Sequence, residues 1–255
     1  MRLSLAIALV ALLLAAAIPA TAEVAQKGGV RVSLDGGLSP ERLPRSGTAP
    51  VRVSFATRIA ATRSGNLPQL REVEIAINRA GRLDFAGLPS CTAEQIQPAT
   101  SAKALAACRG ALIGRGSFSA SVDFDEQAAF PAEGEMLAFN GTHNGRPAIL
   151  AHIYGTDPVP TSLTLPFVIR KSAGTFGTVL RATLPVSGGS YVTGFELSLH
   201  RVYSHRGKRH SYANAGCPAP KGFPGAAFPF ARTTYRFSGG RAVEMTLQRS
   251  CRARG

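Results

Sequence analysis

The chain has 255 residues, 45% of them hydrophobic, and it carries 29 Lys and Arg residues against 15 Asp and Glu residues. This composition provides enough apolar surface for a core and includes no long polar tract, which excludes an intrinsically disordered protein. The length allows one large β-rich domain or two small ones, and the positive charge favours anionic partners.

The N-terminal segment has the pattern of a cleavable secretory signal. Arg2 precedes an apolar run from Leu3 to Ile18, and small residues follow that run. The run is shorter than a membrane-spanning helix requires, and no later segment is long and apolar enough to cross a bilayer. We therefore expect residues 1–22 to be removed. Residues 23–255 are then expected to work outside the cytoplasm, either secreted or held in the periplasmic or cell-wall space.

Strict alternation of apolar and polar residues dominates the remaining chain and indicates half-buried strands. We predict an all-β fold, an antiparallel β-sandwich or a jelly-roll-like arrangement. The alternating apolar sets are Val30/Val32/Leu34, Val51/Val53/Phe55, Val73/Ile75/Ile77, Phe118/Ala120/Val122/Phe124, Leu163/Leu165/Phe167/Ile169, Phe195/Leu197/Leu199 and Val243/Met245/Leu247.

Dipeptides that tolerate positive φ stand between these runs and predict tight hairpin turns. They are Asn140-Gly141, Asn144-Gly145, Arg206-Gly207 and Gly239-Gly240, and Ala80-Gly81 is expected to turn a strand back into Leu83 and Phe85.

One possible subdomain boundary lies near residues 155–161, where Pro158 and Pro160 coincide with a change in charge. The segment is short and lacks the composition of a linker. We therefore expect a single secreted domain over residues 23–255.

Only one stretch reads as helical. Thr92 and Gln95 resemble a capping box, and Thr100 or Ser101 is placed to cap a short Ala-rich helix that ends near Gly110. A short helical insertion is therefore expected between two cysteines.

The four cysteines permit three pairings. Export favours oxidation, and the spacings do not match the closely spaced ligand pairs of zinc sites. We predict two structural disulfides, Cys91–Cys108 and Cys217–Cys251, and no metal site formed by these residues.

Sequence motifs that carry catalytic or cofactor chemistry are missing, including the nucleophile elbow, the metalloprotease helix, the phosphate loop and the dinucleotide fingerprint. Asp123, Asp125 and Glu126 could hold calcium together with loop oxygens, but a solvated strand end explains them as well. We assign no catalytic residue and no cofactor.

Charge is distributed unevenly along the chain. Residues 23–157 contain 14 basic and 13 acidic residues, whereas residues 158–255 contain 14 basic residues and only two acids, Glu196 and Glu244. A general preference for arginine would raise the basic count everywhere without removing acids from one half. The C-terminal half is therefore expected to attract anionic polymers or surfaces.

The densest basic segment surrounds the Arg206-Gly207 turn, where a cationic hairpin is expected. Arginine offers paired donors to phosphate, sulfate or carboxylate, and histidine protonation below about pH 6.5 would add positive charge. The predicted polyanion-binding residues are Arg201, Arg206, Lys208 and Arg209, with His205 and His210 modulating the interaction by pH.

These observations predict a secreted, non-catalytic protein that associates with anionic polymers or lipid headgroups of the cell envelope or extracellular space. Nucleic acid is not expected as its main ligand, because a secreted protein seldom meets it. Two alternatives stay open: a secreted hydrolase whose site is assembled from distant loops, and a structural module of a surface assembly, which an open sheet edge or an exposed apolar patch would favour.

Overall fold

A computed structural model of the chain describes residues 22–63, 67–123, 128–157, 159–185 and 188–254. The expected signal segment lies outside this part apart from its last residue, Ala22, so its cleavage stays a prediction. In the described ranges, no helix is long and apolar enough to cross a membrane.

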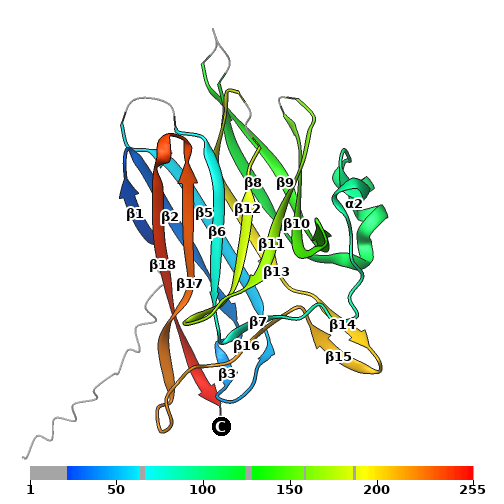
Figure 1. The fold of residues 1–255 in the computed structure, drawn as a ribbon, viewed down its shortest axis with the longest axis vertical. Helices are drawn as coiled ribbons and strands as arrows, with labels where there is room; N and C mark the ends of the chain where they lie inside the picture. Colours follow the sequence, from blue (N-terminus) through cyan, green and yellow to red (C-terminus); the bar gives the residue numbers. More distant parts are fainter. Residues whose placement is uncertain (1–21, 64–66, 124–127, 158, 186–187, 255) are drawn as a thin grey trace, which may run out of the picture.

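The fold is all-β, as predicted, and its main element is one 13-stranded sheet that curls on itself (Figure 1). In spatial order its strands are β1 (Glu23–Lys27), β2 (Val30–Ser39), β5 (Arg52–Ala61), β13 (Ser190–Leu199), β8 (Leu112–Val122), β9 (Phe130–His143), β10 (Arg146–Asp157), β11 (Thr161–Lys171), β12 (Phe176–Thr183), β6 (Leu70–Asn78), β17 (Gly225–Phe237), β18 (Ala242–Arg254) and β3 (Arg42–Pro44). All neighbours are antiparallel except β18 and β3. The curl brings β18 against β1 and β2.

Two small sheets complete the fold. Strands β4 (Ala49–Pro50), β16 (Ala213–Ala215) and β7 (Gly81–Leu83) form one of them, which crosses the lower end of the curled sheet in Figure 1. The prediction that the chain turns back along β6 at Ala80-Gly81 is therefore wrong, because β7 pairs with β16. The Gly216 backbone N–H donates a 2.9 Å hydrogen bond to the Ala80 carbonyl oxygen, which holds the small sheet across the end of the main sheet.

Strands from both sides of the 155–161 segment share the main sheet, and β10 and β11, which flank it, are direct neighbours. The division into domains stays a prediction.

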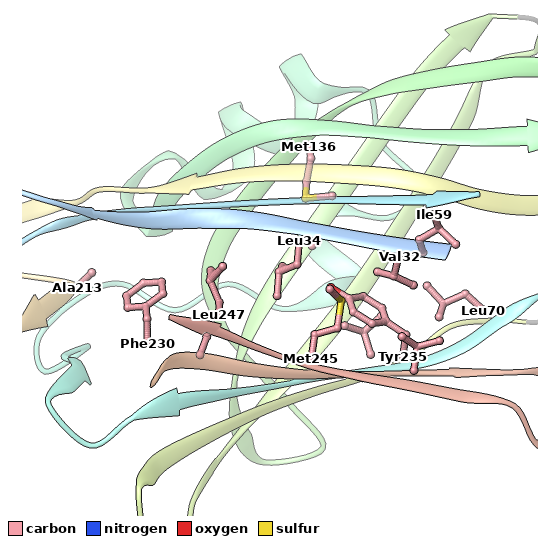
Figure 2. Close-up of a cluster of buried hydrophobic side chains, with 14 of the residues drawn as sticks. Val32, Leu34, Ile59, Leu70, Met136, Ala213, Phe230, Tyr235, Met245 and Leu247 are labelled. Atoms are coloured by element: carbon pink, nitrogen blue, oxygen red, sulfur yellow. The ribbon is translucent and has the colours of Figure 1, made fainter. Parts of the chain in front are cut away.

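The core fills the space between the two facing halves of the sheet. Val32 and Leu34 of β2 lie opposite Tyr235 and Met245 of β17 and β18 (Figure 2). The predicted alternation is confirmed here, since Val30, Val32 and Leu34 are fully buried. The Tyr235 hydroxyl lies 2.7 Å from Thr57 Oγ1, and burial raises the pKa of Tyr235 to about 12.

The helical insertion covers the outer face of β9 and β10. It consists of α1 (Ala93–Ile96), α2 (Ser101–Cys108) and the 3₁₀ turn Arg109–Ala111. The predicted capping box at Thr92 and Gln95 is present, and the Thr100 hydroxyl accepts a hydrogen bond from the Lys103 backbone. Ile96 packs on the outward side chains of β9 and β10, which are therefore buried on both faces.

Both predicted disulfides are confirmed. Cys91 and Cys108 close the helical insertion, and Cys217 and Cys251 join the segment after β16 to β18. Their Cα atoms lie 5.9 Å and 5.7 Å apart, within the ordinary range for disulfides.

Three of the predicted turns are confirmed, since Asn144-Gly145, Arg206-Gly207 and Gly239-Gly240 connect adjacent strands and the residues have positive φ. The turn predicted at Asn140-Gly141 is wrong, because both residues lie inside β9. Asn140 donates a 2.9 Å side-chain hydrogen bond to the Pro89 carbonyl. A Cβ on Gly141 would lie 2.5 Å from the Cys91 carbonyl oxygen, so glycine serves close backbone approach here.

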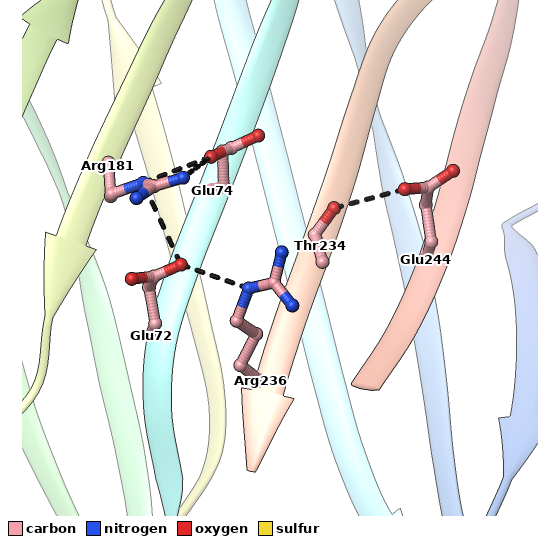
Figure 3. Close-up of polar contacts among 6 residues, drawn as sticks. All are labelled: Glu72, Glu74, Arg181, Thr234, Arg236 and Glu244. Carbon is pink, nitrogen blue, oxygen red and sulfur yellow. Dashed lines mark hydrogen bonds and ion pairs between the residues drawn. The ribbon is translucent and has the colours of Figure 1, made fainter. Parts of the chain in front are cut away.

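Ion pairs between the two halves of the sequence neutralise part of the C-terminal charge. Strand β6 lies between β12 and β17, so Glu72 and Glu74 face arginines from the basic half (Figure 3). Arg181 Nη2 lies 2.5 Å from Glu74 Oε2, and Arg236 Nε lies 3.2 Å from Glu72 Oε1. The uneven distribution of charge along the sequence therefore does not divide the folded molecule into a neutral half and a basic half.

Glu72 is the shared carboxylate of this network. We expect Glu72→Gln to lower the free energy of unfolding by about 1 kcal/mol in low salt, because it leaves Arg181 and Arg236 with a weaker partner. The loss should shrink in about 1 M NaCl, where such pairs are screened. Urea denaturation at both salt concentrations measures it. The exposed Glu41→Gln serves as control, and an equal loss in that variant would contradict the prediction.

Candidate anion-binding hairpin

The predicted cationic hairpin is formed by β14 (Val202–His205) and β15 (Lys208–Ser211), which project from the main sheet below α2 (Figure 1). Arg206 and Gly207 make its turn, with φ of 50° and 70°. The hairpin does not continue β13, which ends at Leu199, because the chain leaves the main sheet before Val202.

One face of the hairpin rests on the segment from Asp84 to Leu88. The Tyr203 hydroxyl donates to the carbonyl oxygens of Asp84 and Ala86 at 3.2 Å and 3.1 Å. Tyr203 stacks on His210 with ring centroids 5.5 Å apart, and His210 Nδ1 lies 3.5 Å from Asp84 Oδ2. Desolvation by this packing raises the pKa of Tyr203. The contacts hold the hairpin as a fixed arm.

His205 belongs to the same face. Its ring lies 5.9 Å from the His210 ring in an edge-on arrangement. It also covers Gly87 so closely that a Cβ at that position would lie 2.1 Å from His205 Nδ1. Both histidines therefore face the protein instead of presenting their rings to solvent at the tip.

The tip carries the exposed positive charge. Arg206, Lys208 and Arg209 are exposed, and within the described ranges they make no ion pair or side-chain hydrogen bond. Arg201 is placed apart from them at the base of the hairpin, where its Nη2 donates to the Gly110 carbonyl at 3.4 Å. The structure therefore groups three of the four predicted cations and separates the fourth.

The sequence did not indicate that the segment around Asp84 supports the hairpin. Pairing of Tyr203 with His210 follows from the turn at Arg206-Gly207, since these residues are opposite in the register. Their contact with Asp84 joins residues far apart in the chain, for which no local pattern exists.

A catalytic site at His152 finds little support. This histidine is fully buried and its Nδ1 lies 3.5 Å from the Thr164 hydroxyl, and among the described residues no serine or carboxylate is hydrogen-bonded to its ring. In the part of the chain that the structure covers, no group of three His, Cys, Asp or Glu residues is arranged to hold a metal. Of the three residues considered for calcium, Asp125 and Glu126 lie outside the described residues.

Features of a surface-assembly module are also weak. The large hydrophobic side chains exposed in the described ranges, among them Val24, Phe85 and Phe223, are scattered over the sequence. The end strands β1 and β3 have five and three residues, too short to offer a long open edge.

His152 should give the protein a measurable pH dependence. Burial lowers its pKa from 6.5, so the unfolded chain takes up a proton that the folded protein does not. Stability should therefore be insensitive to this group above about pH 6.5 and decline below it, by up to about 1.4 kcal/mol per pH unit. Urea unfolding between about pH 7.5 and pH 5 measures the slope. His152→Gln should flatten it, whereas the partly exposed control His143→Gln should not, and an unchanged slope in His152→Gln would refute the assignment.

Comparison with protein-family models, with curated proteins and with solved structures gives no match for this chain.

Proposed function

We propose that this is an extracytoplasmic, non-catalytic protein that binds anionic polymers or lipid headgroups of the cell envelope through the tip of the β14–β15 hairpin. The observation that carries the proposal is the grouping of Arg206, Lys208 and Arg209, exposed and without acidic partners in the described ranges. The two disulfides support an oxidising compartment. In such a compartment, anionic envelope polymers are a more available ligand than nucleic acid.

The geometry of the arm suits a repeating polyanion. Arg206 and Arg209 each offer paired donors for phosphate, sulfate or carboxylate, while Lys208 adds a point charge. Because the Tyr203 and His210 contacts already hold the hairpin in place, ligand binding should cost little conformational entropy. His205 and His210 are the residues we propose to modulate the interaction, and His210 Nδ1 lies 3.5 Å from Asp84 Oδ2.

The test is retention of the mature protein on isolated cell envelope and on a neutral polysaccharide, from about 50 to 500 mM NaCl. Replacing Arg206, Lys208 and Arg209 together by Gln should weaken envelope binding. It should also reduce the slope of log affinity against log salt by about one for each contact removed.

A matched control removes the same charge elsewhere. Arg170, Lys171 and Lys221 are also exposed, and their triple replacement by Gln should leave most of the binding and its salt slope intact. Equal losses in the two triple variants would show that net charge alone drives retention. Salt-independent binding by the native protein would overturn the proposal outright.

A further inference from the structure

The interior of the curled sheet contains an apolar cavity of about 120 Å³. It is similar in size to engineered apolar cavities of about 150 Å³ that stay dry and bind hydrocarbons. Apart from Arg82 and Asn214, its lining residues are apolar or Gly. Phe55, Phe118 and Phe195 line it and are only partly buried, although they pack against the main core.

The residues that line the cavity extend along much of two strands. Its lining runs along β6 from Leu70 to Ile77 and along β13 from Val192 to Leu199. At the usual rise per residue of a strand, each run covers about 23 Å. A volume of about 120 Å³ spread over such a length suits a linear hydrocarbon chain better than a compact ring system. Close-packed interiors contain few voids of this size, so the unfilled space needs an explanation.

The lower end of the cavity carries a positive charge. Arg82 and Asn214 are opposite one another in the small sheet that crosses this end. Arg82 is among the lining residues and is exposed. Among the described residues it has no ion-pair partner. A guanidinium in this position suits the carboxylate of a ligand whose chain lies inside.

From these observations we infer that the protein binds a single-chain amphiphile, with its hydrocarbon chain in the cavity and its anionic head beside Arg82. The inference is independent of the hairpin, since β14 and β15 do not line the cavity.

The first test is displacement of a fluorescent fatty-acid probe from the mature protein by saturated carboxylates of increasing length. Burial of each methylene is worth about 0.8 kcal/mol, so affinity should rise about fourfold per methylene and level off once the chain outgrows the cavity. Adsorption on the surface would show no such limit. Absence of probe binding, or affinity without a length limit, would overturn the inference.

Cavity-filling variants test the location. Val53 and Val192 line the cavity and are partly buried, so Val53→Phe should weaken probe binding at least about tenfold while the protein stays folded. Val192→Phe provides a second variant should the first fail to fold. The same substitution at the exposed Val24 on β1 is the matched control and should bind as the native protein does. Native affinity in a folded Val53→Phe or Val192→Phe variant would place the probe elsewhere and refute the site.

The role of Arg82 is tested with matched ligands. Arg82→Gln should weaken the binding of carboxylates about fivefold or more and leave alcohols of the same chain length unchanged. Equal effects on both ligand types would contradict an anionic head at this end of the cavity.

Discussion

Replacing Cys217 and Cys251 together by Ala is expected to lower the free energy of unfolding by about 4 kcal/mol. The disulfide closes a loop with a sequence separation of 34 residues, and in the chain-entropy model such a loop restricts the unfolded chain by about that amount. Both cysteines are buried in the main core, so Ala avoids placing a hydroxyl there. The bond also ties the segment after β16 to β18, at the end of the curled sheet.

Urea denaturation of the oxidised protein measures this loss. The Cys91→Ala/Cys108→Ala double variant is the comparison, with a shorter separation of 17 residues and an expected loss of about 3 kcal/mol. A reductant added to the native protein should also lower its free energy of unfolding, because it breaks both disulfides. Each double variant already lacks one disulfide, so the reductant should lower its free energy of unfolding by less. A loss below about 1 kcal/mol for the Cys217–Cys251 pair would contradict the prediction, and it would remove the main structural reason to expect an oxidising compartment.

Alternation of apolar and polar residues predicted the strands because one face of each is buried and the other is not. Val30, Val32 and Leu34 illustrate this, as they are all fully buried on β2. The disulfides and the capped helices were likewise predictable, since they depend on few residues close in sequence or on a small number of possible pairings.

Features that depend on contacts between distant segments could not be predicted from the sequence. Asn140-Gly141 has the chemistry of a turn, yet the helical insertion packs over it and uses the glycine for close approach to Cys91. Similarly, the basic half of the sequence does not form a basic half of the molecule, because β6 brings Glu72 and Glu74 between basic strands.

The candidate sites show the same limit. The turn of the cationic hairpin could be predicted from Arg206-Gly207, but the inward orientation of His205 and His210 depends on the distant segment at Asp84. The cavity had no sequence signal at all, since Phe55 and Phe195 have the pattern of ordinary core residues, and only the closure of the sheet leaves space beside their stacked rings.

Gly116→Ala is expected to be the most damaging single glycine replacement in the curled part of the sheet. A Cβ at this position would lie 1.8 Å from the Glu196 carbonyl oxygen and 2.9 Å from the Leu197 Cα, both of them backbone atoms of the neighbouring β13. Backbone cannot rotate away as a flexible side chain can, so the strands must separate. We expect a loss of about 3 kcal/mol in the free energy of unfolding.

The matched control is Gly188→Ala, where, among the described residues other than its chain neighbours, no atom lies within 4 Å of the added Cβ, and the stability should change by less than about 0.5 kcal/mol. Equal stability of the two variants would contradict the close approach at Gly116. Glycines at 116, 134, 155 and 194 lie on four adjacent strands, β8, β9, β10 and β13, and line one surface pocket. Phe118 and Phe195 follow two of these glycines closely in sequence and line the cavity. Glycine is needed at these mid-strand positions because a Cβ would lie against the backbone of the neighbouring strand, and two of these positions belong to the strand segments that enclose the proposed ligand site.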